Sequence, residues 1–240
     1  MRIDNMENRN IKAVCFDVGE TLIYYDGTQL NWKDHYHNAL LEICNTFNVN
    51  PEEESELRAE ATLLEFNTRE NPRIAEFDHE VIFSRLVMDL GIKSGSAMDV
   101  CKPFFRYFQR KAGIYNDTLK VLKELKNKNI PVGVLTDVPY GMPKEFVMED
   151  LKTLVPYIDV VVTSVDAGFR KPHAAGFQLL SEYLNVPLGD MVYVGNEQKD
   201  IDGSLNAGAT AVLIDRNRNS PEWHQHYTIN TLFELEKLLS

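Results

Sequence analysis

The chain has 240 residues, 44% of them hydrophobic, which suits one globular unit or a core that carries a smaller inserted domain. Its formal net charge is −11 and its pI is about 5.0, and such an acidic surface disfavours nucleic acid or an anionic membrane as the main partner. The three cysteines are isolated in apolar segments, which indicates reduced core thiols rather than a disulfide or zinc framework.

The first predicted element is a buried strand that follows a loose leader. Residues 1–10 carry no apolar signal core and no run reaches transmembrane length, so we expect a cytoplasmic protein. Residues 11–16 are mostly apolar, as in a buried parallel strand, and Asp17 comes where that strand should end. Ligands gather beyond the carboxyl ends of parallel strands, so Asp17 is a candidate nucleophile or metal ligand. The alternative is an aspartate in an ordinary strand-to-loop turn.

The next eighty residues or so have helical spacing of their apolar residues. The predicted helices are Trp32–Phe47, a second one starting at Pro51, Phe77–Leu90 and 96–111. We interpret residues 24–112 as an all-helical cap domain inserted into a core made of residues 1–23 and 113–240. The many aromatic residues of the cap are interpreted as its own core.

The remainder of the chain alternates between helices and strands. Predicted helices are Thr118–Lys128, Pro143–Leu154, Ala174–Leu184, Ile201–Ala207 and Thr231–Leu239, and predicted strands are Ile130–Leu135, Asp159–Thr163, Met191–Val194 and Ala211–Ile214. Alternation at this spacing is typical of an α/β fold with a doubly wound, Rossmann-like parallel sheet.

Four short motifs each follow a predicted strand. They are Asp17-Val-Gly-Glu-Thr21, Val132-Gly-Val-Leu-Thr136, Gly168-Phe-Arg-Lys171-Pro172, and Val192-Tyr-Val-Gly195-Asn196 with Asp200. In this order they resemble the four motifs of the haloacid dehalogenase superfamily. The resemblance covers about residues 17–23 and 114–216, and it implies the strand order 3-2-1-4-5, which brings the ends of strands one, two and four together.

The resemblance also implies roles for single residues. In the resembled phosphatases Asp17 would attack phosphorus and form a covalent intermediate that water then hydrolyses. Thr136 and Lys171 would hold the transferring group, and Lys171 would supply the positive charge that two anionic reactants require. Val18, Gly19 and Asp137 would complete the phosphate-binding site. For Thr136 and Lys171, the alternative roles are a strand-ending threonine and a surface lysine before a helix.

A magnesium ion is the cofactor that the resemblance implies. Its ligands would be Asp17, the backbone carbonyl of Gly19, Asn196 and Asp200, because Mg²⁺ prefers oxygen donors. Many family members have Asp in place of Asn196, and a neutral amide is a poorer ligand, which Glu197 or Asp200 would have to offset. The alternative for Asp200 is an N-cap of the following helix.

Gly19 is the main departure from the phosphatase pattern. Phosphatases of this family usually carry a second Asp two residues after the nucleophile, where it protonates the leaving group and then activates water. Glycine can do neither, and losing a general acid or base costs roughly 10²–10⁴ in rate. Glu20 is adjacent and is a candidate substitute, although its side chain leaves the loop in another direction in the family register.

The sequence therefore predicts a hydrolase of a small phosphorylated metabolite, acting on phosphate monoesters or on acyl or aryl phosphates. Two alternatives stay open. One is metal-free cleavage of a carbon–halogen or carbon–phosphorus bond. A dehalogenase of this family needs a cap arginine, yet none occurs between Asp17 and Arg58, and a phosphonate hydrolase needs a cap lysine, for which Lys33 is available. The other is a binding or regulatory protein that has lost catalysis through Gly19 and Asn196.

Overall fold

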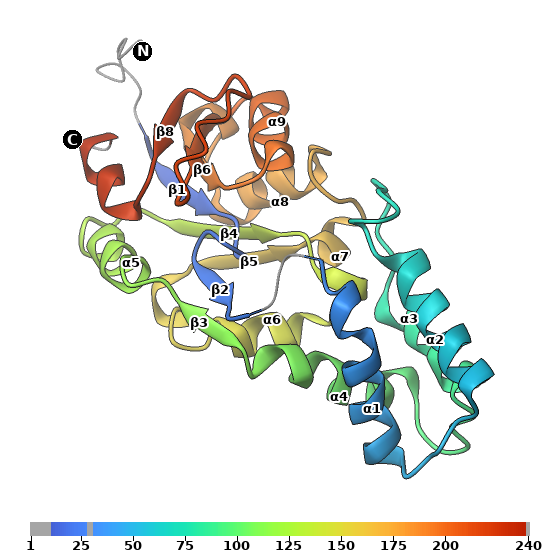
Figure 1. Ribbon diagram of the computed structural model, residues 1–240. Coiled ribbons are helices and arrows are strands. Elements are labelled where there is room, and N and C mark those ends of the chain that lie inside the picture. Colours follow the sequence, from blue (N-terminus) through green and yellow to red (C-terminus); the bar gives the residue numbers. More distant parts are fainter. Residues whose placement is uncertain (1–10, 28–30, 239–240) are drawn as a thin grey trace. The chain divides into compact units, whose positions relative to one another are not determined.

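The computed structural model describes residues 11–27 and 31–238, so the predicted leader, residues 1–10, lies outside the described residues (Figure 1). The chain forms two compact units, here called the core unit and the helical unit. Of the described residues, the core unit comprises 11–24, Ile114–Thr136 and 152–238, and the helical unit comprises 25–27, 31–113 and Asp137–Leu151. The sequence interpretation had placed residues 137–151 in the core, whereas this segment groups with the helices.

A parallel sheet forms the centre of the core unit. Within the described residues it has six strands in the order β5-β4-β1-β6-β7-β8. The strands are β1 (Ala13–Phe16), β4 (Val132–Thr136), β5 (Val160–Thr163), β6 (Met191–Gly195), β7 (Thr210–Ile214) and β8 (Tyr227–Ile229). The doubly wound sheet and the strand order 3-2-1-4-5 are confirmed, and β8, which no apolar run had indicated, adds an edge strand that pairs in parallel with β7.

Helices cover this sheet because its central strands are apolar on both faces. Every residue of β1, β4, β6 and β7 is buried. The helices of the core unit are α5 (Thr118–Asn127), α7 (Ser164–Ala167), α8 (Ala175–Leu184) and α9 (Gln198–Ala207). Helices α8 and α9 lie on one face of the sheet and α5 on the other (Figure 1). No helix in the described part of the chain is long and apolar enough to cross a membrane.

The register of the sheet places the predicted site residues at one edge. Phe16 pairs with Val134 of β4 and with Val194 of β6, so the carboxyl ends of these three strands lie side by side. Asp17, Thr136 and Asn196 stand at or directly after those ends. A parallel sheet thus assembles three motifs that are far apart in the sequence.

The helical unit has an aromatic core of its own. Its helices are α1 (Tyr36–Phe47), α2 (Glu53–Phe66), α3 (His79–Asp89), α4 (Ala97–Gln109) and α6 (Lys144–Asp150). Trp32 stacks on Phe108, with ring centroids 3.7 Å apart, and the Tyr36 hydroxyl lies 2.6 Å from that of Tyr140. Trp32, Tyr36 and Tyr140 are all buried, as expected if the aromatic residues form a core.

Short elements account for the remaining differences from the sequence prediction. The chain passes between the two units within two paired strands, β2 (Ile23–Tyr25) and β3 (Ala112–Ile114), which the sequence analysis did not predict. The predicted final helix is a 3-10 helix, Leu232–Leu238. The other 3-10 segments are Lys33–His35, Pro139–Gly141, Val155–Tyr157 and Leu188–Asp190.

Candidate active site

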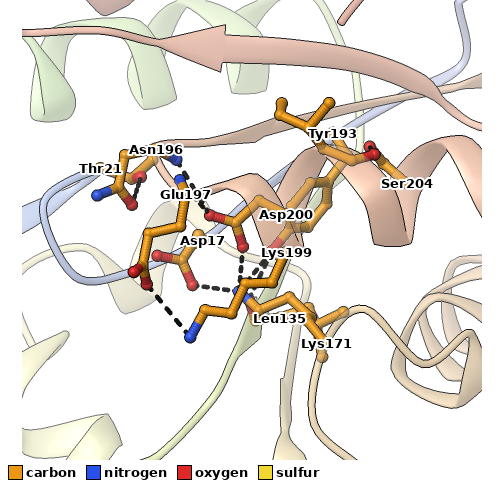
Figure 2. A network of polar contacts seen from close by, with 11 residues as sticks. Asp17, Thr21, Leu135, Lys171, Tyr193, Asn196, Glu197, Lys199, Asp200 and Ser204 are labelled. Carbon is orange, nitrogen blue, oxygen red and sulfur yellow. Dashed lines mark hydrogen bonds and ion pairs between the residues drawn. The ribbon is translucent and has the colours of Figure 1, made fainter. Parts of the chain in front are cut away.

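A buried lysine between two aspartates forms the centre of the candidate site (Figure 2). The ammonium nitrogen of Lys171 lies 2.5 Å from Oδ1 of Asp17 and 2.6 Å from Oδ1 of Asp200. The side chains of Lys171, Asp17 and Asp200 are 1%, 10% and 0% exposed. Three motifs of the sequence therefore meet in one ion-pair cluster that water barely reaches.

Asp200 joins this cluster to the backbone at the start of α9. Its Oδ2 accepts hydrogen bonds from the N–H groups of Asn196 at 3.1 Å and Glu197 at 2.9 Å. A side chain at Gly195 would collide with Asp200, so glycine is required where β6 ends. Oδ1 of Asp200 faces Lys171, and Oδ2 accepts hydrogen bonds from the backbone of the turn. These contacts are typical of a residue that positions Lys171. The metal role proposed for Asp200 from the sequence stays a prediction.

Two further oxygen atoms surround the ammonium group of Lys171. The backbone carbonyl of Leu135 lies 3.3 Å from Nζ, and the hydroxyl of Tyr193 lies 3.1 Å from it. The Tyr193 hydroxyl in turn donates to the Leu135 carbonyl at 2.8 Å. The sequence analysis missed Tyr193, because an aromatic residue inside an apolar strand gives no signal of a polar role.

The cluster sets the charge of the candidate nucleophile. Burial raises the pKa of the Asp17 carboxyl above its ordinary value, and the nearby Asp200 carboxylate adds to the increase. The Lys171 ammonium opposes both effects, because its ion pair with Asp17 favours the charged form. Lys171 therefore favours the ionised form of Asp17, which is the form able to attack an electrophile.

The loop after Asp17 folds back on itself. The Val18 carbonyl accepts hydrogen bonds from the N–H groups of Leu22 at 2.9 Å and Ile23 at 3.1 Å, and the Asp17 N–H donates to the Val194 carbonyl at 2.9 Å. A Cβ atom added at Gly19 would meet nothing within 4 Å, and its φ is not in the left-handed region. The fold thus leaves room for a side chain at position 19, although the sequence provides none.

The carboxylate of Glu20 is hydrogen-bonded to Tyr115, a residue that the sequence analysis did not identify. Glu20 adopts the left-handed region with φ of 56°, and its carboxylate accepts a hydrogen bond from the Tyr115 hydroxyl at 2.5 Å. Arg216 stacks on the Tyr115 ring at 3.8 Å, pairs with Asp117 at 2.9 Å, and donates to the Thr21 carbonyl at 2.7 Å. This bonded arrangement ties Glu20 to the core unit and disfavours its proposed role as a substitute general acid.

The other predicted residues lie at strand ends or in the loops that follow them. Thr136 ends β4 and is buried. Asp137 follows it and is the first residue of the second segment of the helical unit. The amide oxygen of Asn196 accepts a hydrogen bond from the Thr21 hydroxyl at 3.3 Å, which links the first and fourth motifs. Glu197 pairs with Lys199 at 3.2 Å, as Figure 2 shows beside Asp17.

The magnesium site predicted at Asp17 stays a prediction. In residues 11–27 and 31–238, no three His, Cys, Asp or Glu side chains are grouped so that they could hold a metal ion. The predicted ligands Asp17, Asn196 and Gly19 would supply one carboxylate and two neutral oxygens, an amide and a backbone carbonyl. Such a donor set matches magnesium, which binds through one or two carboxylates and keeps several waters.

Curated proteins with similar sequences include several that are named phosphatases. The chain is 32% identical over 126 residues to a glyceraldehyde 3-phosphate phosphatase from Methanocaldococcus jannaschii, a match that covers 50% of this chain and 54% of that protein. It is 24% identical over 159 residues to a ribulose-1,5-bisphosphate 5-phosphatase from Halopiger xanaduensis, covering 62% and 66%, and 28% identical over 127 residues to a phosphoglycolate phosphatase from Escherichia coli, covering 50% and 49%. The matches span about half to two thirds of these relatives' lengths.

Solved structures with the same fold include both phosphatases and dehalogenases. A HAD phosphatase from Thermococcus onnurineus superposes with a TM-score of 0.66 at 23% identity, covering 96% of this chain and 98% of that one. A 2-haloacid dehalogenase from Pseudomonas syringae pv. Tomato also gives 0.66, at 21% identity, covering 95% and 98%. At these identities the likeness establishes the fold and does not choose between the two chemistries.

The family of this chain is shown by a family model that matches more than half of its length. The family model for haloacid dehalogenase-like hydrolases matches residues 11–208, which include all four motifs and every side chain of the buried ion-pair cluster. The chain therefore belongs to the haloacid dehalogenase-like hydrolases.

Proposed function

We propose that this hydrolase is a magnesium-dependent phosphatase of a small phosphorylated metabolite and that it forms a covalent aspartyl phosphate on Asp17. The observation that carries the proposal is the Lys171 ammonium held 2.5 Å from the Asp17 carboxylate at the carboxyl edge of the sheet. A cation in this place offsets the repulsion between an anionic nucleophile and an anionic phosphoryl group. The phosphatase names of the relatives support the same reading.

The proposed chemistry has two steps. Lys171 engages Oδ1 of Asp17, so Oδ2 would attack phosphorus, forming a new P–O bond while the bond to the leaving oxygen breaks. Thr136 would donate a hydrogen bond to a phosphoryl oxygen. Water then attacks phosphorus in the second step and breaks the P–O bond to Asp17. This step releases inorganic phosphate, passes one water proton to solvent and returns the carboxylate of Asp17.

Magnesium would be held by Asp17, Asn196 and the Gly19 carbonyl, with water completing its shell. When bound, it would neutralise negative charge on the phosphoryl oxygens. We propose a positioning role for Asp200. It forms an ion pair with Lys171 and accepts hydrogen bonds from the N–H groups of Asn196 and Glu197.

Activity on a panel of phosphate esters, acyl phosphates and aryl phosphates, with and without magnesium, tests this proposal. Metal-dependent release of phosphate supports it. Cleavage of a haloacid or a phosphonate without metal would favour the alternatives. Lys33, the lysine considered for a phosphonate hydrolase, pairs with Glu70 at 3.3 Å and is half exposed, as a solvated surface pair would be. Bound phosphate without any turnover would indicate a binding protein.

Gly19→Asp is expected to raise the rate on alkyl phosphates by roughly 10- to 10⁴-fold, up to the range that a general acid supplies. The wild-type enzyme lacks a carboxyl group at this position and should favour aryl and acyl phosphates, whose leaving groups need little protonation. The new side chain has open space and no backbone strain to overcome. The measurement is kcat/KM on one alkyl and one aryl phosphate.

Gly19→Asn is the matched control for this change, because it adds a side chain of the same shape that cannot transfer a proton. It should leave the ratio of alkyl to aryl rates at the wild-type value. A wild-type enzyme that already hydrolyses both substrates equally well would contradict the missing-acid explanation.

Asn196→Asp is expected to lower the magnesium concentration that gives half-maximal activity by roughly tenfold, because a charged ligand binds Mg²⁺ more tightly than an amide. The backbone contact of Asn196 with Asp200 is unaffected by the change. Magnesium titration of both proteins measures the shift. An unchanged midpoint would remove Asn196 from the proposed metal ligands. Asn50→Asp, at an exposed position of the helical unit, serves as the control for added charge alone.

A further inference from the structure

We propose that Tyr193 is a positioning residue that fixes the ammonium group of Lys171 for phosphoryl transfer. This inference rests on the proposed function, because it assigns to Tyr193 an effect that is exerted through Lys171. Tyr193 lies in β6, its side chain is almost fully buried, and its hydroxyl is 3.1 Å from Nζ of Lys171. Figure 2 shows the Tyr193 side chain beside Lys171 and Asp200.

The Leu135 carbonyl fixes the direction of the Tyr193 hydroxyl. The hydroxyl has one proton, and it donates that proton to the Leu135 carbonyl at 2.8 Å. Its oxygen is then available to accept a hydrogen bond from Lys171, whose ammonium group carries three protons. The Nζ of Lys171 donates hydrogen bonds to Asp17 Oδ1, the Leu135 carbonyl and the Tyr193 hydroxyl, while Asp200 pairs with it by charge at 2.6 Å.

Packing holds the tyrosine ring in this orientation. Phe177 of α8 contacts it edge to face, with ring centroids 4.8 Å apart. A side chain at Gly203 would collide with Phe177, so the glycine in α9 leaves the space that Phe177 occupies. The ring also lies 5.6 Å from the Lys171 ammonium, within the range of a cation–π interaction.

The position of Lys171 matters more for the transition state than for substrate binding. A displacement of about 1 Å in a catalytic group can cost a large part of the rate, because the charge no longer matches the atoms where negative charge develops. Removing the Tyr193 hydroxyl removes one of the hydrogen bonds of the ammonium group, while those to Asp17 Oδ1 and to the Leu135 carbonyl at 3.3 Å are retained. The ammonium should then lose its single, fixed position between the two aspartates.

Tyr193→Phe tests the inference, with an aryl phosphate as the probe. We expect kcat to fall by about tenfold, equivalent to about 1.4 kcal/mol, while KM changes by less than about twofold. Tyr36→Phe is the matched control, since it removes another buried tyrosine hydroxyl, one that bonds to Tyr140 and Asn67 in the helical unit. A Tyr193→Phe enzyme with normal kcat and only a lower Tm would overturn the proposal.

Coupling to Lys171 separates a positioning role from a general loss of order. In a Lys171→Met background, Tyr193→Phe should change the single-turnover rate by less than about twofold, because the group it positions is gone. If the two substitutions lowered the single-turnover rate by independent factors that multiply in the double variant, the proposal would be overturned. If Lys171→Met does not fold, Lys171→Arg replaces it, and there the tyrosine change should again have a smaller effect than in wild type.

Wild type, Tyr193→Phe, Lys171→Met and the double variant also form a double-mutant cycle for unfolding, which does not depend on activity. Non-additive changes in the denaturation midpoint would support the Tyr193–Lys171 contact even if wild type hydrolysed no phosphate in the panel, a result that would count against the proposed function alone. Additive midpoints would overturn the positioning role, whatever the activity.

Discussion

Replacing Asp17 with asparagine is expected to lower kcat by roughly 10⁴-fold or more, the scale seen when an enzyme loses its nucleophile. An amide in this place cannot form the acyl phosphate. The fold should persist, because Lys171 keeps its ion pair with Asp200 at 2.6 Å. Steady-state rates on an aryl phosphate, together with a thermal melt, measure both expectations.

Asp215→Asn provides the matched control. Asp215 is also a buried aspartate directly after a strand of the same sheet, where it accepts hydrogen bonds from the N–H groups of Asn219 and Ser220. Its replacement should leave kcat near the wild-type value. An Asp17→Asn protein that kept most of its activity would contradict a covalent mechanism.

Lys171→Met is the second change with a large expected effect, and it should lower both activity and stability. Removing the cation leaves Asp17 and Asp200 buried without a positive partner, which typically costs about 3–5 kcal/mol of unfolding free energy. It also removes charge stabilisation of the transferring group, which costs roughly 10²–10³ in kcat. Because this ion pair is buried, Lys171 contributes to stability as well as to activity.

A double variant separates these two losses. Lys171→Met combined with Asp200→Asn removes one buried negative charge, so part of the lost unfolding free energy should return while kcat stays low. Denaturant unfolding and single-turnover rates provide the two measurements. A Lys171→Met protein with normal kinetics and only a lower Tm would make Lys171 a structural residue.

The sheet could be predicted because its strands are short apolar runs separated by amphipathic helices. This pattern identified β1, β4, β5, β6 and β7, and the family resemblance supplied their order. The three-residue strands β2, β3 and β8 could not be predicted, since so few residues show no periodicity. The grouping of residues 137–151 with the helices depends on tertiary contacts that no local pattern encodes.

Site residues could be predicted from the sequence only where a reactive residue type stands at the end of an apolar segment. Asp17 and Lys171 carry charge at the ends of apolar segments, so their types alone suggested a site, and the structure brings them within 2.5 Å. Tyr193 and Tyr115 gave no such signal, because a tyrosine in or near an apolar segment has the same pattern whether its hydroxyl bonds to a site residue or not. Their roles depend on partners distant in sequence, Leu135 and Glu20.

The measurement that tests the central claim most directly is detection of the covalent intermediate on Asp17. Turnover of an aryl phosphate with magnesium is quenched in acid, and the digested protein is analysed by mass spectrometry. The account predicts one phosphoryl group on the peptide that contains Asp17, and none in Asp17→Asn treated in the same way. A phosphoryl group on another residue, or undiminished turnover by Asp17→Asn, would contradict it.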